Sequence, residues 1–519
     1  MLNMKVQYEK FSSSSKFNFD ALVIFENKPS SAKKTSKSQS KYSNNFQKID
    51  KEFGFLLSES VSRDSFEFDL AGIQVITLSS QNKIPPKYKS IKKLIIVGMG
   101  LGESDTSDKS YRKVYSSLTR KLKAESLEKV AIFSPQKPGL LTEILLLVDY
   151  EFTKYKSQDE KSKSKKKKLA EIKIFADDFS AQDKKNIKNA QIIAESTCKA
   201  RDLVWEPACE VTPTYLAETA LKLDQKVVKV TIKEASECKK LGMGAFLAVA
   251  QGSDQPPKFI EFSYKPSGKI KKHIALIGKG VTFDSGGLSL KPAKSMEMMK
   301  EDMSGAAAII GIMNAISKIQ PPNVMITAII AATENMPNGR AYRPGDVITA
   351  MNGKTIEVNN TDAEGRLTLA DAVAYVSTKA PDEIIDFATL TGACMTALGN
   401  VCGGLMGNNQ DLIDRLKQSA DRQGELVWQL PLYDEYKEGL KSTIADLINA
   451  GSGGKAGAQN GALFIAEFVG KQKDSDKVIP WAHLDIAGPC WFDQDMDWSP
   501  RGASGIPVRT ILDYINQQV

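Results

Sequence analysis

Long apolar runs, paired cysteines and histidines are all scarce in this chain of 519 residues, and each scarcity excludes a class of protein. The longest apolar stretches, such as 324–332, are far shorter than the roughly 18 residues that a membrane-spanning helix needs. The first residues lack the apolar core of a secretory signal. We therefore expect no membrane association and a cytoplasmic location.

Cysteine and histidine usage excludes several kinds of metal and redox site. The six cysteines are scattered without a CxxC pair, which excludes a zinc ribbon and a dithiol redox motif and predicts free thiols. The only histidines, His273 and His483, exclude an HExxH zinc protease and any site with three histidine ligands. A Ser-His-Asp triad remains open, but it would depend on one of these two residues.

The excess of positive charge is confined to two segments. Segment 154–168 carries a net charge of +6 and segment 28–41 carries +5, so the rest of the chain carries −3 within a total of +8. Both segments are rich in Ser and Lys, and Tyr155 is their only aromatic residue, which favours solvated loops over a nucleic-acid or lipid surface. Nucleic acid stays an alternative partner.

Short β-branched runs separated by helical stretches predict an α/β protein with two domains. Between residues 20 and 176 this alternation predicts a smaller N-terminal α/β domain, residues 1–182, with a mainly parallel sheet. Apolar residues three and four positions apart predict a linker helix over 183–203. Strand-like runs and Ala-rich helical stretches then predict a larger catalytic domain, residues 204–519, with a central mixed sheet flanked by helices.

Two glycine-rich segments lack the features of a phosphate-binding loop. GMGLGE (98–103) follows a predicted strand but is not a full GxGxxG, which favours a plain strand-to-helix turn. In AGSGGKAGAQNGA (450–462), Lys455 is followed by Ala456 rather than Ser or Thr, so we expect a loop leading into a helix at 462–470.

Acidic and basic residues gather in two segments, GKGVTFDSGGLSLKP (278–292) with MEMMKEDMSGAAA (296–308), and NTDAEGRLTLADA (360–372). Taken singly, each of these residues has a plain structural explanation. Asp284 fits an Asx-turn, Asp302 fits a helix N-cap, and Thr361 with Glu364 fits a capping box. The cations Lys279, Lys291 and Arg366 would then be neutralising partners of the acids.

Taken together, the same residues form an oxygen-rich set that suits hard divalent metal ions in a chain poor in histidine. Four carboxylates can bridge two ions about 3.5–4 Å apart, as in two-metal hydrolases. An extended segment would direct Asp362 and Glu364 to one face, and a nearby cation would stabilise an oxyanion.

NTDAEGRL (360–367) resembles the signature of the leucyl (cytosol) aminopeptidase family, and GKGVTFDSGGLSLKP resembles its other metal-binding segment. The resemblance continues through ARDLVWEPACEVTPT (200–214), ATLTGA (388–393) and WAHLDIAG (481–488), and it is weaker in the first domain. It implies a metal-dependent exopeptidase that removes N-terminal, Leu-like or Met-like residues from peptides.

The resemblance also implies a role for individual residues. One divalent ion, Zn²⁺ or Mn²⁺, would bind Lys279, Asp284, Asp302 and Glu364, and a second would bind Asp284, Asp362 and Glu364. Lys279 would then be a neutral amine. A water bridging the two ions would attack, Lys291 would polarise the scissile carbonyl, and Arg366 would hold a bicarbonate that acts as general base.

The resemblance further places the pocket for the N-terminal side chain at Met299, Thr389, Gly392 and Ala487, and it implies a homo-hexamer. The chain departs from the family where Gly505-Ile506-Pro507 replaces a common Gly-Arg-Pro, after the Trp-rich segment 490–500. This departure affects the far rim of the pocket and the subunit contacts rather than the metal ligands. A scaffold that has lost activity is the third alternative, and the complete ligand set argues against it.

Overall fold

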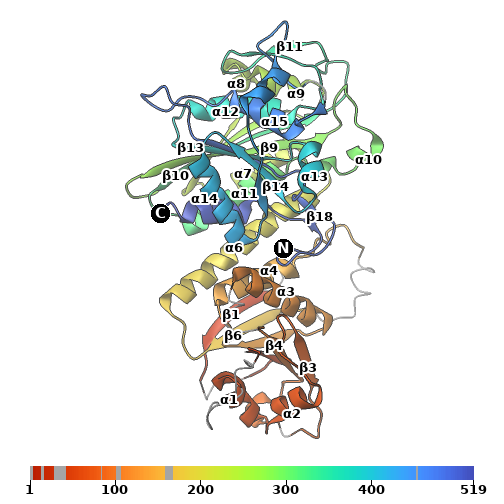
Figure 1. Cartoon of the computed structure of the whole chain (residues 1–519), viewed down its shortest axis with the longest axis vertical. Coiled ribbons are helices and arrows are strands. Elements are labelled where there is room, and N and C mark those ends of the chain that lie inside the picture. Colours follow the sequence, from red (N-terminus) through yellow and green to blue (C-terminus); the bar gives the residue numbers. More distant parts are fainter. Residues whose placement is uncertain are drawn as a thin grey trace. The chain divides into compact units, whose positions relative to one another are not determined.

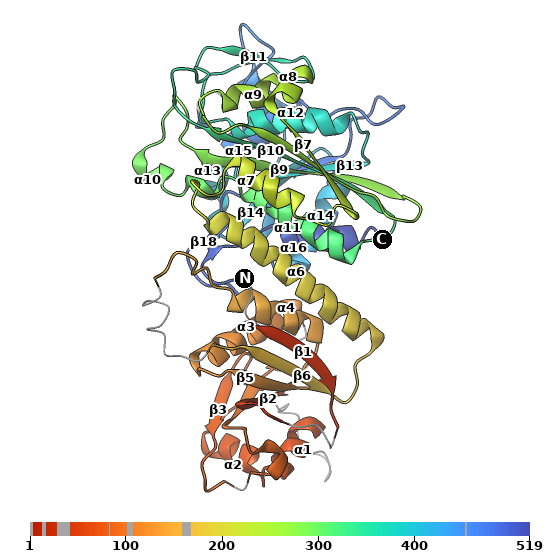
Figure 2. The same ribbon diagram turned by 180° about the vertical axis from the view of Figure 1, so that it is seen from behind.

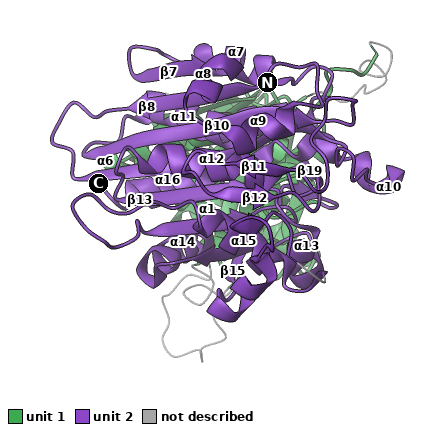
Figure 3. Ribbon diagram, turned by 90° about the horizontal axis from the view of Figure 1, so that it is seen from above, with its two compact units in different colours: residues 1–195, 495–500 green, residues 196–494, 501–519 purple. Residues whose placement is uncertain are grey.

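A computed structural model describes residues 4–12, 17–28, 42–82, 84–100, 107–157, 168–451 and 454–519. Residues 29–41 and 158–167, which make up most of the two lysine-rich segments, lie outside the described residues. So do residues 101–103 of the first glycine-rich segment and 452–453 of the second. The chain divides into two compact units, which Figure 3 colours separately. Unit 1 comprises residues 1–195 and 495–500, and unit 2 comprises 196–494 and 501–519, so the division falls within helix α6 (Ala181–Trp205).

Unit 1 is built on a sheet with the strand order β1-β6-β5-β2-β4-β3 among the described residues (Figure 1). Its neighbouring strands are parallel except for β3 and β4, which confirms the predicted mainly parallel sheet. The strands are β1 (Lys5–Lys10), β2 (Ala21–Glu26), β3 (Ile73–Thr77), β4 (Lys93–Gly98), β5 (Lys129–Phe133) and β6 (Glu171–Ala176). Its helices are α1 (Asn44–Glu52), α2 (Leu56–Arg63), η1 (Pro86–Tyr88), α3 (Asp108–Ala124) and α4 (Pro138–Asp149).

Helices cover both faces of this sheet, with α1 and α2 on one face and α3 and α4 on the other (Figures 1 and 2). The face under α1 and α2 is rich in aromatic side chains, and Phe46, Phe68 and Tyr88 are almost fully buried in it. Aromatic side chains bury a large apolar area each, so a few of them are enough to hold two short helices on the sheet.

Unit 2 contains a larger mixed sheet with the order β15-β14-β17-β13-β9-β10-β8-β7 over the described part of the chain. The strands are β7 (Val228–Lys233), β8 (Lys258–Tyr264), β9 (Lys272–Asp284), β10 (Val324–Asn335), β13 (Glu383–Ala388), β14 (Gly403–Gly407), β15 (Val427–Gln429) and β17 (Trp481–Asp485). Smaller sheets comprise β11 (Val347–Thr349), β12 (Thr355–Glu357) and β16 (Leu447–Ile448), and β18 (Trp491–Phe492) with β19 (Gly502–Ala503).

The longer helices of unit 2 form a layer on each face of the large sheet (Figures 1 and 2). One layer contains α9 (Gly244–Ala250), α12 (Gly365–Ser377) and α15 (Gly457–Ala466). The other contains α7 (Pro213–Leu221), α11 (Ser304–Ile319), α14 (Gln410–Gln423) and α16 (Val508–Asn516). Shorter helices are α8 (Ala235–Lys240), α10 (Ala293–Met296), η3 (Met299–Glu301), α13 (Gly392–Leu398) and η4 (Asp434–Leu440). This arrangement confirms the predicted mixed sheet flanked by helices.

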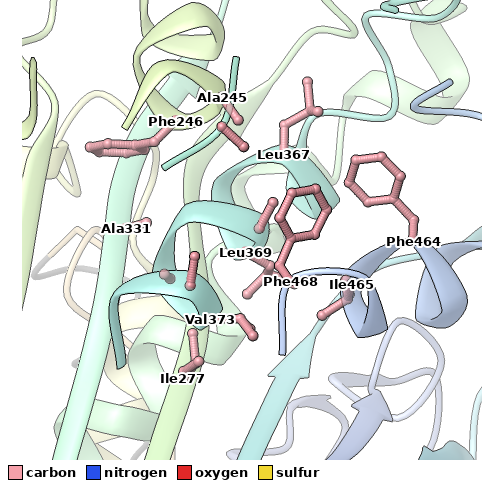
Figure 4. Packing of buried hydrophobic residues seen from close by; sticks show 14 of the residues in the cluster. Ala245, Phe246, Ile277, Ala331, Leu367, Leu369, Val373, Phe464, Ile465 and Phe468 are labelled. Carbon is pink, nitrogen blue, oxygen red and sulfur yellow. The ribbon is translucent and has the colours of Figure 1, made fainter. Parts of the chain in front are cut away.

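Helix α12 lies inside the core between α9 and α15. Leu367, Leu369 and Val373 of α12 pack with Phe464 of α15 and with Phe246 of α9 (Figure 4). Residues 365–376 are buried on every side of the helix, which is the pattern of a helix enclosed by other elements. The prediction of a helix at 462–470 is displaced, because α15 begins at Gly457 and places its apolar residues in this core.

The carboxyl ends of four central strands meet at one edge of the large sheet. Strands β17, β13, β9 and β10 are parallel to one another. Asp284 therefore ends β9, Asn335 ends β10 and Asp485 ends β17 on the same edge, and Thr389 directly follows β13. Ligand sites of open α/β sheets lie at this edge.

No helix among the described residues is both long enough and apolar enough to cross a membrane. All six cysteines lie within the described residues and are free thiols, as predicted.

Candidate functional site

Lys279, in the middle of β9, is the centre of a buried charge cluster. Its Nζ lies 2.7 Å from Asp302 Oδ1 and 2.9 Å from Glu364 Oε1, and it donates a 2.9 Å hydrogen bond to the backbone carbonyl of Thr389. The side chains of the three charged residues are all buried. A Cβ at Gly365 would lie 2.5 Å from Lys279 Cε, so glycine after Glu364 lets α12 begin directly against the lysine.

Burial and opposite charges act against each other in this cluster. Burial disfavours the Lys279 ammonium, but Asp302, Glu364 and Asp284 outweigh it and raise the pKa of Lys279 above its usual range. Burial raises the pKa of Asp302 well above its ordinary value, and burial together with the charge of Glu364 raises the pKa of Asp284. The three carboxylates thus outnumber the one ammonium beside them, and burial makes the remaining negative charge costly.

A second cation, Lys291, joins the two other acidic ligands that the sequence predicts. Its Nζ lies 2.9 Å from Asp284 Oδ2 and 2.5 Å from Asp362 Oδ1. Burial opposes its charge, but Asp284 leads the carboxylates that raise the pKa of Lys291 above its usual range. Asp284 Oδ1 also accepts a 2.8 Å hydrogen bond from the Gly286 N–H, so the Asx-turn explanation holds alongside the ion pair.

Two buried carboxylate oxygens of the cluster have no hydrogen-bond partner among the described residues, namely Asp302 Oδ2 and Glu364 Oε2. Asp284, Asp302 and Glu364 each offer an oxygen within 4.8 Å of the others, which is a spacing that can hold a metal ion. Buried polar atoms normally have partners, so unpaired oxygens grouped in this way mark a position for a cation.

Arg366, in the first turn of α12, is buried without an ion pair among the residues that the structure describes. Its Nη1 donates a 3.0 Å hydrogen bond to the carbonyl of Asn449, and its buried Nε has no partner in the described chain. Burial, only partly offset by the charges of Glu364 and Asp485, lowers the pKa of Arg366 to about 10. Arg366 is therefore not the neutralising partner that one alternative predicts, and its guanidinium keeps a free donor.

Three local expectations are wrong. The N-cap of α12 is Glu364 without a side-chain cap, so Thr361 and Glu364 form no capping box, and the Thr361 hydroxyl donates instead to the carbonyl of Gly286. Asp302 is not the N-cap of α11, because Met303 takes that position and the Asp302 carboxylate turns to Lys279. Residues 361–364 form a turn rather than an extended segment, because Glu364 already has helical backbone angles.

The four predicted pocket residues lie in three segments: Met299 begins η3, Thr389 and Gly392 lie between β13 and the start of α13, and Ala487 follows β17. Thr389 lies against the charge cluster, because its hydroxyl donates a 2.8 Å hydrogen bond to Asp302 Oδ1. Gly392 is exposed, and a Cβ there would meet no atom within 4 Å. Met299 and Ala487 are half-buried.

Two polar residues of this edge escape sequence reasoning. Asn335 is fully buried and donates 2.8 Å and 2.9 Å hydrogen bonds to Asp284 Oδ1 and to the carbonyl of Thr361, so it orients a predicted ligand. Asp485 binds the loop after β13. Both stand at the polar end of an apolar run beside the strands that carry the motifs, which is the signal that could have identified them.

The turn η3, which precedes Asp302, is held by a cation and two indole rings. Lys300 Nζ donates a 2.8 Å hydrogen bond to the carbonyl of Trp205 and lies 5.6 Å and 5.7 Å from the ring centroids of Trp205 and Trp491. The centroids of these two indole rings are 4.4 Å apart. The first part of the Trp-rich segment thus stabilises the turn that carries Met299 and leads to Asp302.

Comparisons with known proteins agree along the chain. Residues 198–512 match the model of the cytosol aminopeptidase family, catalytic domain, and residues 24–159 match the N-terminal domain of the same family. A probable cytosol aminopeptidase of Aquifex aeolicus is 42% identical over 83% of this chain and 86% of its own, and one of Persephonella marina is 43% identical over 82% and 85%. A solved structure of a mutant tomato leucine aminopeptidase matches with a TM-score of 0.82 and 34% identity, over 99% of this chain and 96% of that chain.

Proposed function

This chain belongs to the cytosol aminopeptidase family, a family of metal-dependent exopeptidases, and from that premise we propose how its own residues act on peptides. The observation that carries the proposal is the buried cluster around Lys279, with its two unpaired carboxylate oxygens. The proposed reaction is hydrolysis of the first peptide bond of a substrate with a free N-terminus.

The residues present fit two divalent cations. Asp284, Asp302, Asp362 and Glu364 bring four formal negative charges, whereas Lys279 and Lys291 bring two positive ones, so added cations relieve an imbalance that burial makes costly. One ion would be held by Lys279, Asp284, Asp302 and Glu364, and the other by Asp284, Asp362 and Glu364. The oxygen-rich donor set accepts Zn²⁺ or Mn²⁺.

When bound, such ions polarise a carbonyl and lower the pKa of a coordinated water. Binding requires the neutral amine of Lys279, so its ammonium must lose a proton as the ion enters. Lys291 keeps its charge and lies within 3 Å of both Asp284 and Asp362. Its ammonium is therefore placed to stabilise negative charge that develops on a carbonyl oxygen bound beside these carboxylates.

Arg366 fits a small planar anion. Its Nε is a buried donor without a partner in the described chain, and a guanidinium binds carboxylate-like anions through two parallel hydrogen bonds. We assign it a bicarbonate, which would accept the proton of the attacking water. His483 Nδ1 is bound to Asp386 and His273 Nε2 is bound to Thr327, and neither ring forms a hydrogen bond with the carboxylates of the cluster among the described residues, so we give the role of base to the bicarbonate.

The N-terminal side chain of the substrate would lie between Met299, Thr389, Gly392 and Ala487. Gly392 leaves open space where a larger residue would intrude, and Met299 offers an apolar, adaptable surface, so we propose a preference for Leu or Met. We further propose a cytoplasmic homo-hexamer, which size-exclusion chromatography with light scattering would test.

The test of the proposed function is hydrolysis of a panel of aminoacyl-coumarin substrates by the full chain. Chelation should abolish the activity, and added Mn²⁺ or Zn²⁺ should restore it together with two equivalents of bound metal per chain. N-acetylated versions of the same substrates should not be hydrolysed, since a free amine defines an aminopeptidase. Activity that survives complete removal of metal would contradict the proposal.

A further inference from the structure

Asp485, the last residue of β17, ties together two loops at the edge of the sheet. Its Oδ1 accepts hydrogen bonds from the N–H groups of Leu390 and Ala487, each 3.2 Å long, and its Oδ2 accepts a 2.7 Å hydrogen bond from the hydroxyl of Thr391. The carboxylate is fully buried, and no cation among the described residues forms an ion pair with it. All three partners are therefore neutral donors from two different loops.

These loops carry three of the four residues assigned to the substrate pocket. Thr389 and Gly392 flank the Leu390 and Thr391 donors, and Ala487 is itself a donor. The Thr391 hydroxyl also accepts a 3.1 Å hydrogen bond from the Cys394 N–H, so it caps the helix α13 that begins at Gly392. Asp485 thus fixes both the loop after β13 and the start of α13.

The same loop contacts the metal-ligand cluster from its other side. The carbonyl of Thr389 accepts from Lys279 and its hydroxyl donates to Asp302, one residue before the Leu390 N–H that Asp485 binds. Charge-assisted hydrogen bonds are shorter and stronger than neutral ones, so a carboxylate at this position restrains the loop more firmly than a backbone carbonyl would. The loop after β13 is therefore bound on one side by Lys279 and Asp302 and on the other side by Asp485.

We propose that Asp485 is a positioning residue that sets the separation of the two loops and thereby the discrimination between large and small N-terminal side chains. The inference rests on the proposed function, because the loops form the assigned pocket. An apolar pocket distinguishes side chains by a few methylene groups, and that discrimination depends on close contact with the walls. Looser walls reduce it without removing any group that acts on the peptide bond.

The experiment compares Leu-coumarin and Ala-coumarin substrates in the wild type, Asp485→Ala and Thr391→Val. Asp485→Ala should lower the Leu-to-Ala ratio of kcat/KM by about tenfold, mainly through a higher KM for the Leu substrate, because the wall contacts are lost in binding. Thr391→Val, which removes one of the three donors, should shift the ratio in the same direction by about two- to threefold. Both variants should keep two equivalents of metal, and hydrogen exchange should become faster in residues 389–392.

Asp371→Asn is the matched control. Asp371 is equally buried in unit 2 and accepts 2.8 Å hydrogen bonds from the N–H groups of Phe246 and Met351, whose segments contain none of the assigned pocket residues. It should leave the Leu-to-Ala ratio unchanged. A wild type that hydrolyses no member of the panel contradicts the proposed function, whereas an active wild type whose ratio survives Asp485→Ala and Thr391→Val overturns only the role of Asp485.

Discussion

Charged groups are buried at both ends of the central strands of unit 2, but the two ends differ in how these groups are paired. At the amino end, Glu383 begins β13 and is almost fully buried. One carboxylate oxygen binds Lys272 at 2.7 Å and also Arg415, and the other accepts from the Tyr514 hydroxyl. Every acceptor of this carboxylate has a partner from β9, α14 or α16.

At the carboxyl end of the same strands, Asp302 and Glu364 each keep one oxygen without a partner in the described chain. Cations are present at both ends, so the presence of buried charge does not separate a structural cluster from a functional one. The difference lies in completeness: a fully paired carboxylate holds elements together, and an incompletely paired group of carboxylates leaves room for an ion. Five experiments test this distinction.

Removal of a shared ligand should have the largest effect. In Glu364→Ala, both proposed ions lose a carboxylate, so the chain should lose both metals and at least about 10³-fold in kcat, since a bound metal contributes several kcal/mol to transition-state stabilisation. Asp302→Ala should weaken mainly one ion. Elemental analysis with kinetics checks both variants, and two full equivalents of metal in Glu364→Ala would refute the ligand assignment.

Lys291→Ala should cause the second largest loss of activity. Loss of a single group that stabilises an oxyanion typically costs roughly 10²–10³ in kcat, and Lys291 is not a proposed metal ligand. Steady-state kinetics and metal analysis should therefore show a slow chain with its full metal content. If metal is lost with activity, the ammonium of Lys291 acts in assembling the site rather than in the reaction.

Arg366→Ala should reduce kcat by about 10², within the range for loss of a general base. The variant should also stop responding to added bicarbonate, whereas the wild type and Lys291→Ala still respond. The measurement is the initial rate against bicarbonate concentration in degassed buffer. An unchanged response in Arg366→Ala would require another general base.

Glu383→Ala probes the other end of the strands and should affect stability alone. It leaves Lys272 and Arg415 without their buried partner, and because both cations are partly exposed we expect a loss of about 2 kcal/mol in the free energy of unfolding. Urea unfolding and kinetics together check this prediction. A folded variant with a large fall in kcat would show that the paired end also serves the reaction.

The last experiment concerns Asp371 and changes only how stability depends on pH. Burial raises its pKa to about 7 from an ordinary value of 3.8, so the folded chain binds more protons than the unfolded chain between these values. The free energy of unfolding should therefore fall as pH rises from about 4 to 7, by up to about 1.4 kcal/mol per pH unit from this group, and level off above pH 7. Asp371→Asn should flatten that slope in urea unfolding at pH 5, 6 and 8, and an unaltered slope would contradict the shift.

The strands that can be predicted are those rich in β-branched and aromatic residues, such as β2 and β8, because these side chains favour a pleated, buried conformation. Strand β14, with the sequence GGLMG, is missed for a tertiary reason. A Cβ at Gly407 would lie 2.4 Å from the carbonyl of Trp481, so close packing between neighbouring strands requires glycine where propensity argues against a strand.

The acidic and basic residues of the candidate site are identifiable because they crowd into two short segments. Which of these residues pair with one another cannot be predicted, since the pairing depends on which strand ends meet in space. Asp302 lies 23 positions from Lys279 and Asn335 lies 51 positions from Asp284, and neither separation carries a periodic signal. The role of Asp485 stays hidden for a related reason, because the loop residues that it binds lie 95 and 94 positions away in the sequence.

The indole pair beside η3 also gives the chain an optical property. The ammonium of Lys300 lies over the rings of Trp205 and Trp491, so any displacement of the turn between Met299 and Asp302 alters the electric field at two of the five tryptophans. Indole emission responds to nearby charge. The intrinsic fluorescence of the unlabelled chain is therefore expected to report the arrival of an ion at Asp302 in real time.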